Sequence, residues 1–260
     1  MGIKQTLTKD LLPLQYQCFN LQETKDGKTH SVYLLGDKYV VKIVSHEEHD
    51  ALLNEQKLLD YLDSFTVPKL LDIVQKEEFI LAFYTQIQGK SIAIPKKEHI
   101  QQIALFLKQF HSFSKDFISS NTKTYDTSYL KTLVLQTQNL QLSHYFQTIN
   151  CNLKNDGVIH GDLFWDNAKF QNDTLSGVYD FISASQGDFI FDLAVVAVSW
   201  CFDGPILVEN KLNVLVDTYG LKIEKEIFIE YIKYALLYYI TTRYLAQREY
   251  QELLEKLEQL

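Results

Sequence analysis

One short segment constrains this chain more than any other: it runs from His160 to Asn167 and is followed by Asp180. The segment reads His-Gly-Asp-Leu-Phe-Trp-Asp-Asn, so a side-chain amide follows the carboxylate of Asp162 after five residues. A second carboxylate, Asp180, comes 180 − 162 = 18 residues after Asp162, beyond a short hairpin pattern. Carboxylate and amide oxygens are the hard ligands that Mg²⁺ prefers in proteins. The spacing therefore predicts one site built on these three side chains, with the rest of the chain as its scaffold.

The pattern H-x-D-x-x-x-x-N is the spacing of the catalytic loop of kinases. In such a loop the Asp takes the proton of the attacking hydroxyl, and the Asn holds a Mg²⁺ ion. We therefore predict Asp162 as the catalytic base, with Asn167 and Asp180 as metal ligands. Phosphoryl transfer depends on positioning and charge neutralisation, so the site also needs a cation for the phosphates of a nucleotide.

Lys42 is the candidate for this cation. It lies in the β-branched run from Tyr39 to Val44, a setting like that of the strand lysine in kinases. By itself, such a lysine could equally be an edge-strand residue that points to water. Glu55 follows 55 − 42 = 13 residues later in a leucine-rich helical pattern, and we predict that it turns inward and pairs with Lys42. The acids at 47 and 48 come too early, at the helix start, where the helix dipole favours negative charge.

The turn at residues 26–31 is the candidate for covering the phosphates. Its backbone N–H groups, together with Lys28, Thr29 or Ser31, could contact the nucleotide. The turn holds a single glycine and no G-x-G-x-x-G series. A plain hairpin loop therefore explains this turn equally well.

Three residues near the central segment are predicted to support it. His160 has no other His or Cys at ligand spacing, so we expect its ring to hydrogen-bond the loop backbone rather than a metal. Asp166 either faces the substrate or caps the turn, and the sequence leaves both possibilities open. Asp192 is predicted to begin a helix and to accept hydrogen bonds from the backbone of the catalytic loop.

The order of the predicted elements indicates an α+β fold with two lobes. Residues 1–84 are expected to form a nucleotide-binding lobe with a small antiparallel sheet and one helix. A connector at 85–97 opens the second lobe, 85–260, which is mostly helical and carries the catalytic and substrate-binding residues. Strands are predicted at 20–25, 31–35, 39–44, 69–74 and 79–84, and helices at 47–61, 99–113, 125–148 and 192–202. Two short strands are expected around the central segment, and two further helices close the chain.

Composition limits the classes of partner and compartment. The net charge of −8 argues against a nucleic acid or an anionic membrane as the main partner. Three widely spaced cysteines form no C-x-x-C pair, which argues against a disulfide framework or a zinc site and suits a reducing compartment. No apolar run is long enough to cross a bilayer, and the first residues do not have the pattern of a signal peptide. We therefore expect a cytoplasmic location, while the oligomeric state has no signal in the sequence.

Motifs of other enzyme classes are absent from the sequence. It contains no G-x-x-x-x-G-K-[ST] loop, no G-x-G-x-x-G after a strand, no G-x-S-x-G and no H-E-x-x-H. Phosphoryl transfer is therefore the enzyme chemistry that the motifs favour.

Three strings together resemble a known family. The strings from His160 to Asn167, from Gly177 to Phe181, and Asp192-Leu-Ala resemble the aminoglycoside phosphotransferase/choline kinase family, the small-molecule branch of the protein-kinase-like fold. The resemblance implies ATP and Mg²⁺ as cofactors and a small molecule's hydroxyl as the phosphate acceptor. It also implies the base role for the Asp and the metal roles for the Asn and the second Asp.

Longer strings look most like the bacterial homoserine kinases of that fold. They begin at Gly157 and Leu175, and a third runs from Trp200 to Asp203. The usual homoserine-kinase string has Ala where this chain has Gly161. The resemblance therefore implies the fold and the reaction more firmly than the acceptor.

For the acceptor, two residue sets point to different chemistries. The carboxylate of homoserine is best held by a bidentate arginine, and Arg243 lies in an aromatic-rich helical pattern that could line the acceptor pocket. A cationic acceptor such as choline, ethanolamine or an aminoglycoside would instead need acids and aromatic faces, for example Asp166 and Trp200. A homoserine kinase is our first hypothesis, with choline, ethanolamine, aminoglycoside or sugar kinases as alternatives.

Two hypotheses from other classes remain open at this point. A kinase-like protein could bind a nucleotide or metabolite without turning it over, although Lys42, Asp162, Asn167 and Asp180 are all intact. A protein kinase is disfavoured because the string that begins at Asp180 reads Asp-Phe-Ile and lacks the glycine of D-F-G.

Overall fold

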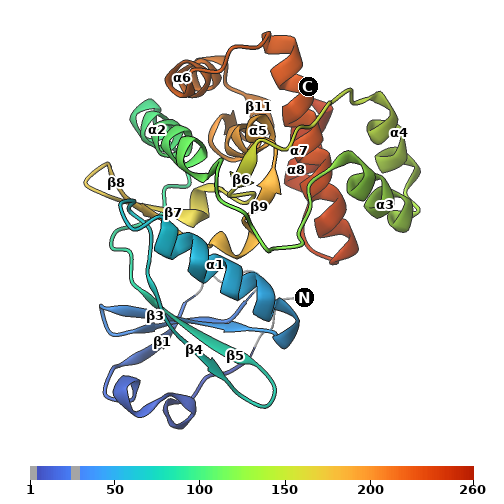
Figure 1. Cartoon of the computed structure of the whole chain (residues 1–260). Helices are drawn as coiled ribbons and strands as arrows, with labels where there is room; N and C mark the ends of the chain where they lie inside the picture. The colour runs from blue at the N-terminus through green and yellow to red at the C-terminus, as the bar shows by residue number, and fades with distance from the viewer. Residues whose placement is uncertain (1–4, 25–29) are drawn as a thin grey trace.

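The computed structural model describes residues 5–24 and 30–260, which form two lobes (Figure 1). The first lobe is built on a five-stranded antiparallel sheet in the order β1-β2-β3-β5-β4. Its elements are η1 (Lys9–Leu11), η2 (Leu14–Tyr16), β1 (Leu21–Glu23), β2 (Val32–Leu35), β3 (Tyr39–Val44), η3 (His46–Glu48), α1 (His49–Tyr61), β4 (Leu70–Gln75) and β5 (Ile80–Thr85). The predicted α+β fold with two lobes is confirmed, and the strands and helix of this lobe lie within about two residues of their predicted positions.

The side chains of β3 alternate between two hydrophobic cores, one on each face of the sheet. Val41 and Ile43 pack in a core on the outer face of the sheet, whereas Val44 and Ala82 belong to the core shared with α1 and the second lobe. Successive residues of a strand point to opposite faces. Lys42, between Val41 and Ile43 and opposite Ala82 in the ladder, therefore points toward the second lobe.

Helix α1 places an acid on its buried face. Leu52, Leu58 and Leu59 are buried on this helix, and so is Glu55. Residues three and four apart share one face of a helix, so Glu55 lies on the same side as these leucines. The inward orientation predicted for this acid is present.

The second lobe is mostly helical, with the buried helices α5 and α7 packed against each other at its centre (Figure 1). Its α-helices are α2 (Lys97–Ser114), α3 (Thr127–Thr137), α4 (Leu140–Thr148), α5 (Phe189–Trp200), α6 (Glu209–Tyr219), α7 (Lys225–Leu245) and α8 (Gln251–Glu258). Its strands and 3-10 helices are β6 (Gly157–Ile159), η4 (Trp165–Asn167), β7 (Ala168–Gln171), β8 (Thr174–Val178), η5 (Phe181–Ser183), β9 (Ser185–Gly187), β10 (Phe202–Asp203) and β11 (Ile206–Leu207). Within the described residues, no helix has the length and apolar character needed to span a membrane.

The prediction of one helix over 125–148 was wrong. The chain breaks at Gln138, whose φ of 53° lies in the left-handed region. Asn139 then caps α4, because its side chain accepts hydrogen bonds from the N–H groups of Gln141 and Leu142. An amide side chain that caps a new helix competes with continuation of the old one.

Three other predictions about this lobe also need correction. Three helices rather than two follow residue 203, and four short strands rather than two surround the central segment in the described chain. Asp192 does not begin a helix, since it lies in the first turn of α5. Asp188 is the N-cap there and accepts the N–H groups of Ile190 and Phe191.

Strand pairing brings the two halves of the central segment together. β6 pairs with β9, and β7 pairs with β8. The loop from His160 to Asn167 leaves β6 and enters β7, and Asp180 follows β8. The two carboxylates separated by 18 residues therefore emerge from neighbouring strand ends.

The connector after β5 is tied to β7. Lys90 and Phe170 exchange backbone hydrogen bonds of 3.0 and 2.9 Å. Gly89 has a φ of 106°, and a Cβ there would overlap the carbonyl of Phe170. The connector therefore needs glycine at this position in order to approach the strand.

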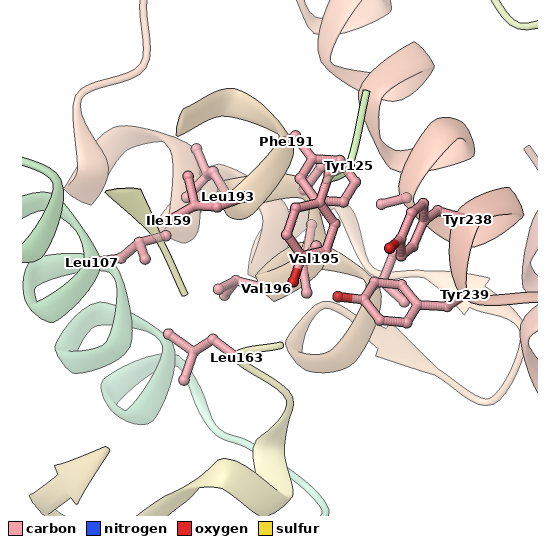
Figure 2. Packing of buried hydrophobic residues seen from close by; sticks show 14 of the residues in the cluster. Leu107, Tyr125, Ile159, Leu163, Phe191, Leu193, Val195, Val196, Tyr238 and Tyr239 are labelled. Carbon is pink, nitrogen blue, oxygen red and sulfur yellow. The ribbon is translucent and has the colours of Figure 1, made fainter. Parts of the chain in front are cut away.

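A tyrosine cluster flanks α5 under the central segment. Figure 2 shows Tyr125, Tyr238 and Tyr239 grouped beside Phe191 and Val195. Ring contacts at 5.1 Å between Tyr125 and Tyr238 and at 5.4 Å between Tyr238 and Tyr239 hold the group together. The loop from His160 to Asn167 packs on this aromatic layer through Phe164, whose ring centre lies 4.9 Å from that of Tyr239.

Candidate active site

Lys42 and Asp180 meet between the two lobes, with Lys42 Nζ 2.7 Å from Asp180 Oδ1. Lys42 is 7% exposed, and Asp180 adopts a φ of 68° just before η5. Burial opposes both charges, but the attraction of the pair raises the pKa of Lys42 and lowers the pKa of Asp180. The two groups therefore form an ion pair at neutral pH.

Glu55 lies near this pair but takes a different partner. Its carboxylate accepts a hydrogen bond of 2.8 Å from the hydroxyl of Tyr84, on β5. Burial raises the pKa of Glu55 to about 7, against the opposing charge of Lys42. In the described part of the chain the ion-pair partner of Lys42 is Asp180, so the predicted Lys42–Glu55 pair is not formed in this structure. The sheet places Tyr84 on the same face as Lys42. The hydroxyl of Tyr84, rather than the ammonium of Lys42, is therefore the hydrogen-bond partner of the Glu55 carboxylate.

Asp162 and Asn167 are joined within the loop. Asn167 Nδ2 donates to the backbone oxygen of Asp162 at 2.7 Å and to its Oδ2 at 3.3 Å. The amide oxygen of Asn167 is thereby left as the atom that can accept a cation. Burial raises the pKa of Asp162 to about 7; the charge of Lys123 opposes this shift and that of Asp180 adds to it. A carboxyl group with a pKa near neutrality is suited to proton transfer.

His160 and Asp192 hold the loop by its backbone. The N–H groups of His160 and Gly161 each donate to one carboxylate oxygen of Asp192, both at 2.8 Å. The ring of His160 accepts the N–H of Asp162 at Nδ1 and lies 3.2 Å from the carbonyl of Tyr179 at Nε2. The contacts expected for His160 and Asp192 are therefore present, and they couple the position of Asp162 to that of the segment at Tyr179 and Asp180.

Gly161 is required by its neighbours. It has a φ of 70°, and a Cβ there would overlap the hydroxyl of Tyr125. Its carbonyl accepts the hydroxyl of Tyr239. This position therefore needs glycine while Tyr125 packs against the loop.

Arg243 faces the site from α7. It is four residues after Tyr239 and so shares its side of the helix. Its guanidinium lies 5.7 Å from the centre of the Phe164 ring, and its charge lowers the pKa of Asp162. Among residues 5–24 and 30–260, no carboxylate forms an ion pair with it.

Trp200 is not available to a substrate. It is fully buried, and its indole N–H donates to the carbonyl of Leu163 at 3.1 Å. The prediction that it lines the acceptor site was wrong, because the apolar face of α5 places it inside the core. Its contact instead holds the loop from His160 to Asn167 at Leu163.

Asp166 is half-buried beside Asp162. Its backbone carbonyl accepts the hydroxyl of Tyr179, and its charge contributes to the raised pKa of Asp162. The substrate contact of its side chain stays a prediction.

The predicted phosphate-covering loop is described only in part. Lys28 and Thr29 lie outside the described residues. Ser31 is buried, and its hydroxyl accepts the backbone N–H of Gln5 at 2.9 Å. This hydroxyl therefore anchors an N-terminal segment, and the structure does not support a phosphate contact from it.

Lys123 is the site residue that the sequence interpretation missed. It lies between α2 and α3, outside every motif, and its Nζ donates to the hydroxyl of Ser183 at 2.8 Å. Its charge acts on Asp162. No local spacing marks this lysine, because its proximity to the loop arises only from the path of the chain.

The donor set fits a magnesium ion completed by phosphate oxygens. Asp180 offers a carboxylate and Asn167 an amide oxygen. No group of three or more His, Cys, Asp or Glu that could hold a metal occurs in the described part of the chain. Magnesium sites of phosphotransferases commonly use one or two carboxylates together with substrate phosphates, so this donor set is sufficient in kind.

Comparisons with known proteins identify the family. Residues 20–214 match the model of the phosphotransferase enzyme family. The chain is 30% identical over 136 residues to a homoserine kinase of Methylobacterium radiotolerans, covering 47% of this chain and 42% of that protein. It is 25% identical over 212 residues to a homoserine kinase of Bartonella henselae, covering 73% and 66%. The chain thus spans about half to two thirds of the length of these curated relatives.

Solved structures share the fold. The chain superposes on the GDP and kanamycin complex of APH(2″)-IIia with a TM-score of 0.71 at 17% identity, covering 92% of both chains. It superposes on the ADP-bound aminoglycoside phosphotransferase APH(2″)-Ib with a TM-score of 0.61 at 18% identity, covering 93% and 92%. At such identities the likeness establishes the fold alone. Together with the family match over three quarters of its length, it shows that this chain belongs to the phosphotransferase enzyme family.

Proposed function

We propose that this protein is an ATP- and Mg²⁺-dependent kinase that phosphorylates the hydroxyl of a small molecule bearing a carboxylate, of the homoserine type. The observation that carries this proposal is the position of Arg243, a cation beside the base Asp162 without an acidic partner in the described chain. The named homoserine kinases among the relatives support the same acceptor.

In the proposed reaction Asp162 orients the acceptor hydroxyl and takes its proton. The acceptor oxygen bonds to the γ-phosphorus while the bond to the β–γ bridging oxygen breaks and its electron pair leaves with ADP. Asn167 and Asp180 would hold Mg²⁺, which when bound neutralises phosphate charge. Lys42 supplies a further positive charge to the phosphates from β3. Asp162 with a pKa of about 7 can hold the proton until the product leaves.

The charges around the base favour an anionic acceptor group. Two cations, Lys123 and Arg243, act on Asp162. Two acids also act on it: Asp180, which is paired with Lys42, and Asp166, which lies in the same loop. An aminoglycoside carries several ammonium groups and would need several acids on this side. A carboxylate meets Arg243 with a charge-assisted and potentially bidentate contact. An amino acid with a terminal hydroxyl therefore fits better than choline or an aminoglycoside.

An ADP-release screen tests the proposal. Homoserine, choline, ethanolamine, sugars and aminoglycosides are compared at equal concentration, with and without Mg²⁺. 3-Aminopropan-1-ol, which is homoserine without its carboxylate, is the matched probe for the role of Arg243. We expect Mg²⁺-dependent ADP release with homoserine and a KM for 3-aminopropan-1-ol higher by about 10- to 100-fold, the scale of one charge-assisted contact. Preference for an amine without a carboxylate would contradict the proposed acceptor.

A further inference from the structure

The segment between α2 and α3 is held by both lobes. It descends to α1 and then returns to α3 (Figure 1). Asn54 of α1 accepts the hydroxyl of Ser119 at 3.0 Å. Asn121 donates from Nδ2 to the carbonyls of Ile182 and Ala184, both at 3.0 Å. The segment is therefore fixed on η5, directly after Asp180, rather than free on the surface.

Lys123 extends from this segment into the site. Its backbone N–H donates to Asn121 Oδ1 at 3.1 Å, and its Nζ donates to the hydroxyl of Ser183 at 2.8 Å. The ammonium also lies 5.3 Å from the centre of the Tyr125 ring, and Tyr125 itself donates to the carbonyl of Ser183 at 2.9 Å. These contacts orient the ammonium, although the residue as a whole stays open to solvent.

The charge of Lys123 is not paired within the protein. No carboxylate lies at ion-pair distance from it in the described part of the chain, while most of the ion pairs that the structure contains are made by other lysines. A surface lysine usually points to water and has no fixed partner. Lys123 is instead oriented by a hydroxyl and a ring, with its charge left for a ligand.

Its contacts place Lys123 beside both Asp162 and Asp180, because Ser183 lies in η5, directly after Asp180, and Tyr125 packs against Gly161. The charges that act on Lys123 come from Asp162 first, then Asp180, and then Glu48 and Lys42. Asp180 and Lys42 are the proposed metal ligand and phosphate cation. Arg243, the other cation near Asp162, comes from α7 and lies over Phe164. The ammonium of Lys123 is therefore directed to the space where the nucleotide and the acceptor would meet.

We propose that Lys123 binds the oxygens of the phosphoryl group while this group passes from the nucleotide to the acceptor. The proposal rests on the proposed kinase function and adds a residue to it. The new bond joins the acceptor oxygen to phosphorus, the bond to the bridging oxygen breaks with its electron pair going to ADP, and the hydroxyl proton goes to Asp162. Phosphoryl oxygens in this position are repelled by Asp162 and Asp180. A fixed ammonium offsets that repulsion, as preorganised charges do in other sites of group transfer.

The kinetic test compares three variants. Lys123→Met removes the charge, Lys123→Arg keeps it, and Lys131→Met removes an exposed lysine from α3 as the matched control. We expect Lys123→Met to lower kcat by roughly 100-fold, the scale of one lost transition-state donor, with KM for ATP and homoserine within about threefold. Lys123→Arg should recover at least a tenth of the activity, and the control should equal the wild type. An unchanged kcat, or a raised KM for homoserine with kcat retained, would overturn the proposal; the second result would assign Lys123 to acceptor binding.

A binding test needs no acceptor. Aluminium fluoride with ADP and Mg²⁺ mimics the phosphoryl group in transfer, and its affinity relative to ADP and Mg²⁺ alone is measured by calorimetry. We expect the wild type to gain affinity from aluminium fluoride and Lys123→Met to lose most of that gain while it still binds ADP. An equal gain in both proteins would overturn the role of Lys123, even if kcat had fallen for structural reasons. If aluminium fluoride raises the affinity of the wild type but the wild type releases no ADP with homoserine, the acceptor assignment fails and the role of Lys123 stands. If aluminium fluoride does not raise the affinity of the wild type, the result counts against both the proposed kinase function and the role of Lys123.

Discussion

On the first-lobe side of the site the charged groups are paired within the protein, whereas on the second-lobe side the cations beside Asp162 are not. Lys42 pairs with Asp180, and Glu48 lies 3.0 Å from His30. Lys123 and Arg243 have no carboxylate partner among the described residues. A paired charge keeps the folded lobes together and must exchange partners when a ligand binds. An oriented but unpaired cation keeps its charge for the ligand, so the two sides should respond differently to substitution.

Asp162→Asn should have the largest effect, because both sides depend on this group. We expect kcat to fall by about 10³-fold, within the range for loss of a general base, while the affinity for ATP and Mg²⁺ is retained. Steady-state kinetics and calorimetry measure the two quantities. Asp166→Asn, at the neighbouring acid, is the control and should lose far less. Full activity of Asp162→Asn would contradict the base role.

Asp180→Asn tests the paired side. The amide leaves the buried Lys42 without its ion-pair partner, so the free energy of unfolding should fall by about 1–3 kcal/mol, less than for a fully buried pair because the Asp180 side chain is 32% exposed. The stabilisation by ATP and Mg²⁺ in a thermal-shift measurement should also be lost.

The double variant Lys42→Met, Asp180→Asn separates the two effects. It should recover part of the stability, because no unpaired charge remains, but not the binding of ATP and Mg²⁺. A single Asp180→Asn variant that keeps its full thermal shift with ATP and Mg²⁺ would count against the metal role.

Arg243→Ala tests the unpaired side. We expect the KM for homoserine to rise by about 10- to 100-fold, with little change in the free energy of unfolding, since no ion pair is broken. The KM for 3-aminopropan-1-ol should stay the same. Arg248→Ala, at the only other arginine of the chain, is the matched control. Equal losses with both acceptors would show that Arg243 does not bind a carboxylate.

Glu48→Gln tests the contact between Glu48 and His30 in the first lobe, through the pH dependence of the free energy of unfolding. Burial opposes the charge of Glu48, but hydrogen bonds with His30 and Ser45 lower its pKa to about 2. The unfolded chain binds this proton near pH 4.3, so the carboxylate stabilises the fold above about pH 5 and loses this contribution as the pH falls toward 2.

Urea unfolding at several pH values measures this effect. The variant should be less stable than the wild type by about 1–2 kcal/mol at pH 7, and the difference should shrink toward pH 2. Glu47→Gln, at the exposed neighbouring acid, should change the stability by less than about 0.5 kcal/mol. A difference that does not vary with pH would rule out the charge as its cause.

Thr241→Val should have the smallest effect and concerns the helix that carries Arg243. Thr241 is fully buried, and its hydroxyl has no hydrogen-bond partner within the described chain. Its replacement by valine should raise the free energy of unfolding by about 0.5–1 kcal/mol and leave kcat unchanged. Thr242→Val, which removes a hydroxyl that donates to Tyr239 O at 3.1 Å, should not stabilise. A loss of activity in Thr241→Val would mean that the acceptor side depends on the packing of α7.

The first lobe and the central loop were largely predictable, for local reasons. Strand alternation predicts that Lys42 of β3 points inward. The spacing of five residues between Asp162 and Asn167 brings these two residues within hydrogen-bond distance. The second lobe was less predictable from the sequence. The break at Gln138 and Asn139 depends on a cap that periodicity does not reveal, and the burial of Trp200 depends on the whole face of α5.

The sequence by itself determined the kind of chemistry, because the two carboxylates and the amide lie close together along the chain. Their spacing can therefore be recognised without the structure. Only the tertiary structure decided which charges pair and which remain for a ligand. Lys42 meets Asp180 over a separation of 138 residues, and Lys123 meets Ser183 over 60. Contacts at such separations depend on how sheets and helices pack, and no local pattern encodes them. For the same reason, Tyr84 rather than Lys42 became the partner of Glu55.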